Sequence, residues 1–241
     1  MSIKGAYFTL CKSRRRITQN TGLMFQHRFV CLNHADLPSE ILIRQLNSFL
    51  TSTIIVSPAT AYEVWLAKLR GETRRSRELF VTHFKDQYFE YPDLPIWMVC
   101  EVASFGSVSR LYDNMLKSEM KGVAQRYGLQ PTFLASFLHA FVYLRNVCAH
   151  HSRLWDKSLS IKPQLPPGKL WDPIRKSPAN SLFTAASAIY WMLGHDSVAS
   201  ASRKLWRETL VKVMTGFSKR FPELVRFTGF PSDWQSLALW K

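Results

Sequence analysis

The side chains best suited to chemistry lie in one short segment, residues 144–156, which reads LRNVCAHHSRLWD. It places Arg145, Asn146, His150 and His151 directly after a strongly apolar run. An arginine keeps its charge at every physiological pH, whereas a histidine gains and loses a proton near neutrality. Together they supply what phosphodiester cleavage needs, a fixed positive charge and a proton-transfer group. Because the chain has a net charge of +15, nucleic acid is the phosphodiester that its composition favours.

The composition limits both the fold and the partners. At 241 residues the chain has room for one large domain or two small ones, and 46% hydrophobic residues are enough for a sizeable core. The 32 Lys and Arg against 17 Asp and Glu favour a polyanion, with RNA or DNA first and an anionic membrane surface second. A basic protein whose charge serves only solubility is the plainer alternative.

The four cysteines form no C-x-x-C pair, which is typical of free thiols in a reducing cytoplasm, so we expect a cytoplasmic protein. Cys148, His150 and His151 lack a second pair of ligands, so we predict no metal site and no cofactor. The N-terminus lacks the pattern of a signal peptide. The most apolar run, Ile41–Val56, contains several polar residues and is shorter than the roughly 20 residues that cross a bilayer, so no membrane span is expected.

Apolar residues recur with a helical period, and no convincing strand pattern, glycine-rich phosphate loop or internal repeat occurs, so we predict an all-α protein. Gly106 and Ser107 should end one helix and cap the next. The tail, residues 222–241, should be irregular with a short final helix. The first expected helix begins at Pro58, and the next two span Thr73–Tyr88 and Ile96–Phe105. The helix capped at Ser107 is followed by a short one that ends near Gly128, and a further helix begins at Pro131. After a proline-rich crossover at 163–178, the last two long helices span Asn180–Leu193 and Val198–Phe221.

The helix that leads into the segment sets the directions of its polar side chains. Apolar residues spaced by three and four form one stripe centred on Phe141. At about 100° per residue, Arg145 lies roughly 40° from the centre of this stripe. Asn146 and His150 share the opposite, polar face with His139. Arg145 and His150 are therefore about 140° apart on one ideal helix.

Three arrangements could bring Arg145 and His150 together. The long arginine side chain could reach round the helix, the helix could break near Ala149, or the two residues could meet across a two-fold axis. The plainer alternative is that His150 is an ordinary exposed histidine near a helix C-terminus, where positive charge is favourable.

The string Arg145–His150 fits the R-x4-6-H signature of the HEPN superfamily, in which asparagine usually follows the arginine. The longer string at 144–155 resembles the Abi-like family of bacterial abortive-infection proteins, of the AbiD/AbiF type. A second block is similar to the same family, with PIW at 95–97, Glu101, and SFGSVSRLY at 104–112. The resemblance covers Pro58–Lys241. We therefore expect a divergent or partly disordered segment at residues 1–56 and an Abi-like HEPN domain at residues 57–241.

This resemblance implies a HEPN-like helical bundle with additional helices, assembled as a homodimer in which two motifs form one site. It implies a metal-independent endoribonuclease that cleaves RNA through its own 2′-OH, in phage defence or a toxin–antitoxin system. His150 would be the general acid or base and Arg145 would bind the phosphate. Asn146 would orient either His150 or the phosphate. The expected partners are RNA as substrate and a structured non-coding RNA as candidate antitoxin.

Other residues near these motifs have two interpretations each. His151 is either a second acid or base, or a packing or positioning residue beside the stripe. Glu101 is the one ionisable group in an apolar helix, so it is either buried and paired, with Arg145 as candidate partner, or a surface glutamate. Trp155 either stacks a base or fills the core. The candidates for RNA contact after the motif are Arg153, Trp155 and Lys157.

Two further functions fit the same residues. The first is a non-catalytic RNA-binding defence protein held with a structured non-coding RNA, and its His150→Ala variant would bind RNA as the wild type does. The second is a helical interaction protein whose basic charge is incidental, and it predicts no salt-dependent affinity for RNA.

Overall fold

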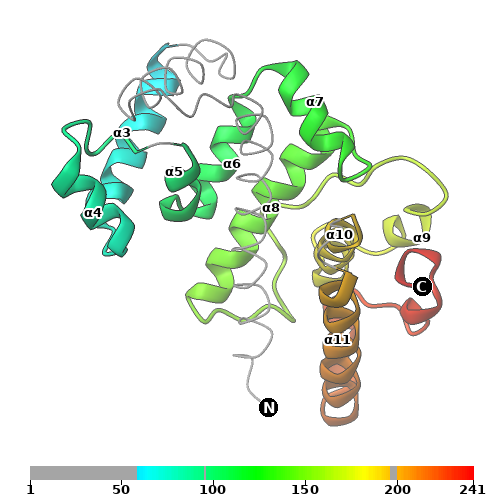
Figure 1. The fold of residues 1–241 in the computed structure, drawn as a ribbon. Helices are drawn as coiled ribbons and strands as arrows, with labels where there is room; N and C mark the ends of the chain where they lie inside the picture. Colours follow the sequence, from blue (N-terminus) through cyan, green and yellow to red (C-terminus); the bar gives the residue numbers. More distant parts are fainter. Residues whose placement is uncertain (1–58, 95, 196–199) are drawn as a thin grey trace. The chain divides into compact units, whose positions relative to one another are not determined.

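The computed structural model describes residues 59–94, 96–195 and 200–241. Within these ranges the chain forms helices and no strand, which confirms the all-α prediction (Figure 1). The described residues fall into two compact units, 59–120 and 121–241. The predicted N-terminal segment, the Pro58 helix start and the apolar run Ile41–Val56 lie outside the described residues.

The first unit is built around its longest helix. Its helices are α3 (Ala59–Arg75), α4 (Leu79–Gln87), α5 (Ile96–Val102) and α6 (Phe105–Asp113). α3 packs against both α5 and α6. The buried Trp65 side chain donates from Nε1 to the carbonyl oxygen of Ser107 at 3.0 Å, which ties α3 to the first turn of α6.

A carboxylate from α3 caps α6. Ser104 is the N-cap residue, and its Oγ accepts from the backbone nitrogen of Ser107 at 3.2 Å. Glu72 Oε2 accepts from the backbone nitrogen of Ser104 at 2.7 Å, and Glu72 Oε1 accepts from Ser107 Oγ at 3.0 Å. A helix N-terminus exposes unpaired N–H groups and favours negative charge. The SFGS string at 104–107 therefore has a structural role in this unit.

Two predicted boundaries in the first unit are wrong. The helix expected over Thr73–Tyr88 is two helices, because Thr73 is buried as the continuation of the α3 face and the break falls between Arg75 and Leu79. Gly106 and Ser107 do not end a helix. They lie in the first turn of α6, since the cap is supplied earlier, by Ser104.

The second unit is centred on α10, in which every residue from Phe183 to Tyr190 is buried. α10 packs against α8, α9, α11 and η4. Pro131 is the first residue of α8, as predicted. The bounds are α7 (Lys117–Gln125, which crosses the unit boundary), α8 (Pro131–Ala149), α9 (Asp172–Arg175), α10 (Leu182–Gly194), α11 (Ser200–Arg220), and the 3₁₀ turns η2 (Pro222–Thr228), η3 (Trp234–Ser236) and η4 (Ala238–Trp240).

The C-terminal tail closes the core of the second unit. Trp240 is fully buried and stacks on Tyr190 with ring centroids 4.5 Å apart. Arg207 Nε donates to the carbonyl oxygen of Trp240 at 2.8 Å. The tail is a series of short 3₁₀ turns, which confirms the expected irregular segment. Burying a large aromatic side chain contributes about 3 kcal/mol, so the tail is part of this unit's stability.

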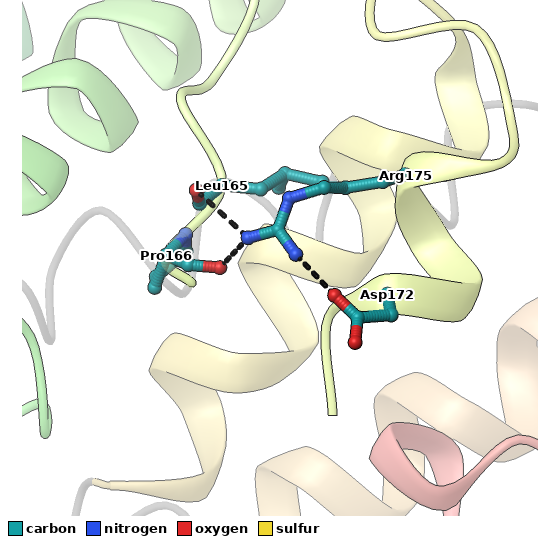
Figure 2. A network of polar contacts seen from close by, with 4 residues as sticks. All are labelled: Leu165, Pro166, Asp172 and Arg175. Carbon is teal, nitrogen blue, oxygen red and sulfur yellow. Dashed lines mark hydrogen bonds and ion pairs between the residues drawn. The ribbon is translucent and has the colours of Figure 1, made fainter. Parts of the chain in front are cut away.

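One arginine makes several of the contacts that hold the proline-rich crossover between α8 and α10. Arg175 Nη1 pairs with Asp172 Oδ1 at 2.7 Å, and Nη2 donates to the carbonyl oxygens of Leu165 and Pro166 (Figure 2). Proline lacks an N–H group and cannot form a regular ladder. Side-chain donors to its free carbonyl groups therefore fix the path of the crossover.

α8 is also, among the described helices, the one long and apolar enough to cross a membrane by length and composition. Within the structure, 39% of the apolar window is buried. Core helices of soluble proteins meet the same criterion, so length and composition here are weak evidence for a membrane span.

Candidate functional site

The motif lies at the C-terminal end of α8. The helix ends at Ala149, and His150 is the C-cap residue, with its backbone N–H donating to the carbonyl oxygen of Asn146 at 3.0 Å. The helix therefore ends near Ala149, where a break was one of the three arrangements that could bring Arg145 and His150 together.

His151 ends the helix in an unusual backbone conformation. Its φ is 53°, the left-handed region that glycine adopts most readily. Its N–H donates to the carbonyl oxygen of Cys148, and the N–H of Ser152 donates to that of Val147, both at 3.1 Å. These two hydrogen bonds make a Schellman motif with a histidine in the usual glycine position.

The exposure of the motif residues agrees with the helical geometry. Asn146 and His150 are exposed on the polar face, together with His139. Arg145 is half-buried at the edge of the apolar stripe, and its Nε atom is buried without a hydrogen-bond partner. His151 is exposed, so it does not pack beside the stripe.

Arg145 and His150 present different sides of α8 and are joined by no hydrogen bond among the described residues. Five residues correspond to about 7.5 Å along the helix axis. The arginine thus offers an incompletely satisfied guanidinium, and the histidine a ring open to solvent. Chemically, the first suits an anion and the second suits proton exchange with a bound molecule.

Glu101 is exposed, so the prediction that it is a buried charge is wrong. α5 is only seven residues long and packs against α3, with Val99 buried on the packed side. Glu101 follows Val99 by two residues, or about 200° on a helix, so it lies on the opposite side of α5 from this buried side chain. Glu101 and Arg145 lie in different units, and their pairing stays a prediction.

The residues after the motif divide between structure and surface. Trp155 is half-buried and its ring lies 6.2 Å from that of Phe217 in α11, between centroids. The guanidinium carbon of Arg153 lies 5.6 Å from the centroid of the Trp155 ring, while Arg153 itself is exposed. Trp155 therefore has packing partners, and base stacking by it stays a prediction. Lys157 is half-buried.

One side chain on this face was missed in the sequence. Tyr143 lies three residues before Asn146 and seven before His150, so all three share one face of α8. Its hydroxyl donates to Ser160 Oγ at 3.4 Å. This contact lowers the pKa of the Tyr143 phenol, and the positive charge of Lys157 acts in the same direction. The spacing of three and four was the available signal.

Positive charge is concentrated in the unit that contains the motif. Residues 121–241 include 17 Lys and Arg against 6 Asp and Glu, a formal net charge of +11. Residues 59–120 include 8 against 9, a net charge of −1. Among the described residues, no group of three His, Cys, Asp or Glu side chains could hold a metal ion.

The structure thus defines an all-α protein whose basic unit presents an R-x4-H motif at the end of a long helix. The chain matches the Abi-like protein family over residues 16–156, and it belongs to that family. The matched range includes the whole Arg145–His150 motif. It begins at residue 16, so it extends into the segment before Pro58 that the sequence resemblance did not cover, and it ends at residue 156 rather than at Lys241. Membership indicates abortive infection, a phage-defence response. No curated protein and no solved structure matches the chain.

Proposed function

We propose that this protein is a HEPN-type, metal-independent endoribonuclease that acts in the cytoplasm during phage defence or as the toxin of a toxin–antitoxin system. The observation that carries the proposal is the C-terminal end of α8. There Arg145 has a buried Nε without a partner, five residues before an exposed His150. The net charge of +11 in the same unit supplies the attraction for RNA.

The reaction uses the nucleophile that RNA carries. The ribose 2′-oxygen forms a bond to phosphorus, the bond from phosphorus to the 5′-oxygen breaks, and a 2′,3′-cyclic phosphate and a 5′-hydroxyl result. The His150 imidazole of one copy takes the proton from the 2′-hydroxyl, and a second, protonated imidazole gives a proton to the leaving 5′-oxygen. Such proton transfer contributes about 10²–10⁴-fold. Arg145 donates to the non-bridging oxygens as their charge grows.

Two copies of the chain supply the two imidazoles. One copy offers His150 on the polar face of α8 and Arg145 about 140° away. A two-fold axis beside the end of α8 would place Arg145 of one copy against His150 of the other, and would bring two His150 rings to one phosphate. His151 is the alternative second imidazole within a single copy.

The test is cleavage of single-stranded RNA by the purified full chain in EDTA. His150→Ala and Arg145→Ala should each lower the rate by at least about 100-fold. His83→Ala and Arg126→Ala are matched controls at exposed positions outside the motif and should retain the wild-type rate. Cleavage that survives both motif variants, or that requires added magnesium, would refute this mechanism.

A mixing experiment tests the composite site. His150→Ala and Arg145→Ala are each inactive, but a mixed dimer contains one intact Arg145 opposite one intact His150. When the two proteins are unfolded, mixed and refolded together, we expect a rate above that of either variant and below that of the wild type, because the mixed dimer keeps one Arg145–His150 pair but only one of the two His150 imidazoles. If each copy carried its own complete site, the mixture would stay inactive. RNA binding without cleavage by any variant would favour the non-catalytic RNA-binding alternative.

A further inference from the structure

The polar face of α8 extends beyond the motif towards the N-terminus of the helix. His139, Tyr143, Asn146 and His150 follow each other at spacings of four, three and four, so they form one row along the helix. His139, Asn146 and His150 are exposed, and Tyr143 is half-buried. We call these four residues the α8 row.

The chain after the motif folds back along one edge of this row. Tyr143 OH contacts Ser160 Oγ at 3.4 Å, and the backbone nitrogen of Gln164 donates to Ser136 Oγ at 2.8 Å. The returning segment is held independently, because Leu159 is buried and its N–H donates to the carbonyl oxygen of Asn180 at 3.0 Å. The segment therefore does not need the tyrosine contact to keep its place.

The Tyr143 hydroxyl makes only a weak hydrogen bond. Hydrogen bonds between two oxygens are usually 2.5–3.0 Å long, so 3.4 Å marks a poor contact. Lys157 lies on the same returning segment, three residues before Ser160, and its positive charge lowers the pKa of the phenol. A negatively charged phosphate oxygen would accept a stronger hydrogen bond from the tyrosine hydroxyl than the serine oxygen does, and the lysine would add a second positive donor.

We propose that Tyr143 and Lys157 form a nucleotide subsite of the RNA site. They hold the nucleotide next to the one whose phosphate lies at Arg145 and His150. The inference rests on the proposed ribonuclease function and adds a strand direction, along the α8 row. Tyr143 donates to a phosphate oxygen while its ring covers a sugar or base, and Lys157 neutralises the same phosphate.

The experiment measures binding separately from cleavage. A fluorescein-labelled single-stranded oligouridylate is titrated with the full chain carrying His150→Ala, in EDTA, and anisotropy gives the Kd over a series of salt concentrations. Tyr143→Phe should weaken binding about tenfold, since it removes one hydrogen bond to a charged group. Tyr143→Ala should weaken it by about a further tenfold, through lost stacking.

Two matched controls separate RNA contact from a structural role. Ser160→Ala removes the same hydrogen bond from the other side, so a tyrosine that only fastens the returning segment would give equal effects for Ser160→Ala and Tyr143→Phe. We expect Ser160→Ala to bind as tightly as its parent. Lys157→Gln should lower the slope of log Kd against log salt by about one, and the exposed Lys169→Gln should not.

The outcomes distinguish the subsite from the ribonuclease proposal. Tyr143-dependent binding together with no cleavage by the wild type leaves the subsite standing and removes the nuclease. Wild-type cleavage together with unchanged binding in Tyr143→Phe and Lys157→Gln overturns the subsite alone. Equal losses in Ser160→Ala and Tyr143→Phe also overturn it.

Discussion

The left-handed backbone at His151 leads to a prediction in which stability and activity change in opposite directions. His151 occupies the position in which a Schellman motif usually has glycine, with φ at 53°. Both hydrogen bonds of the motif are between backbone atoms, so they do not depend on the side chain at this position. His151→Gly therefore keeps the helix end and removes the steric cost of the Cβ atom.

The size of the effect follows from two opposing terms. A left-handed conformation costs an L-residue about 1–2 kcal/mol. Glycine avoids this cost but loses about 0.5–1 kcal/mol more conformational entropy on folding. The fair comparison is His151→Gly against His151→Ala, because alanine keeps the Cβ atom and loses the imidazole. We expect the glycine variant to be the more stable by about 1 kcal/mol, or about 2–4 °C in Tm for a chain of this length.

Thermal and urea unfolding of both variants, followed by circular dichroism, test this prediction. Ser152 supplies the control, because it is exposed and the next residue along, and its φ is not positive. There the order should reverse, with Ser152→Gly less stable than Ser152→Ala. If His151→Gly were no more stable than His151→Ala, position 151 would not be left-handed in solution and the reasoning would fail.

The same variants report on the role of the imidazole. Strained residues persist where the surrounding structure or the function retains them, so the ring of His151 is a candidate for a functional role that these variants can test. If His151 transfers a proton, His151→Gly should be more stable and yet at least about 100-fold slower in RNA cleavage. A stabilised variant with the wild-type rate and pH profile would show that the ring takes no part.

Three further predictions concern the first unit. Glu72→Ala should lower the free energy of unfolding by about 2–3 kcal/mol, as measured in urea, because two hydrogen bonds to a charged cap are lost; Glu72→Gln should lose less. Burial raises the pKa of the Tyr112 phenol and nearby Asp113 adds to the shift, so stability should fall as the pH rises above about 10, and Tyr112→Phe should remove that fall. Asp93→Asn should cost less than about 1 kcal/mol, and still less in high salt, because the paired Arg70 and Asp93 side chains are 40% and 36% exposed.

The sequence was most informative where apolar spacing was regular. The stripe centred on Phe141 predicted a helix, its first residue Pro131, and the opposite directions of Arg145 and His150, and the structure agrees on all of these. Periodicity succeeds here because a long helix buries one continuous face.

Prediction failed where a short contact between distant residues decides the outcome. At the start of α6 the N-cap Ser104 is a local signal, but the contact that Glu72 makes with it comes from 32 residues away and no local pattern shows it. Glu101 was a candidate buried charge because its neighbours are apolar, but it is exposed and lies about 200° round α5 from the buried Val99. The left-handed His151 could not be read from the sequence, because the usual glycine is missing there.

The end of α8 explains why a single copy looks incomplete as an enzyme. Arg145 lies half-buried at the edge of the apolar stripe of α8, whereas His150 lies on the exposed face. The packing that stabilises the helix therefore also separates the two side chains. Unwinding the helix to bring them together would expose Leu144 and Val147, which are both buried, and each would cost about 2 kcal/mol. The proposed assembly of two copies would join an arginine to a histidine without that loss. This cost supports the proposed site shared between copies, in which the rest of the α8 row would be free to hold the RNA strand.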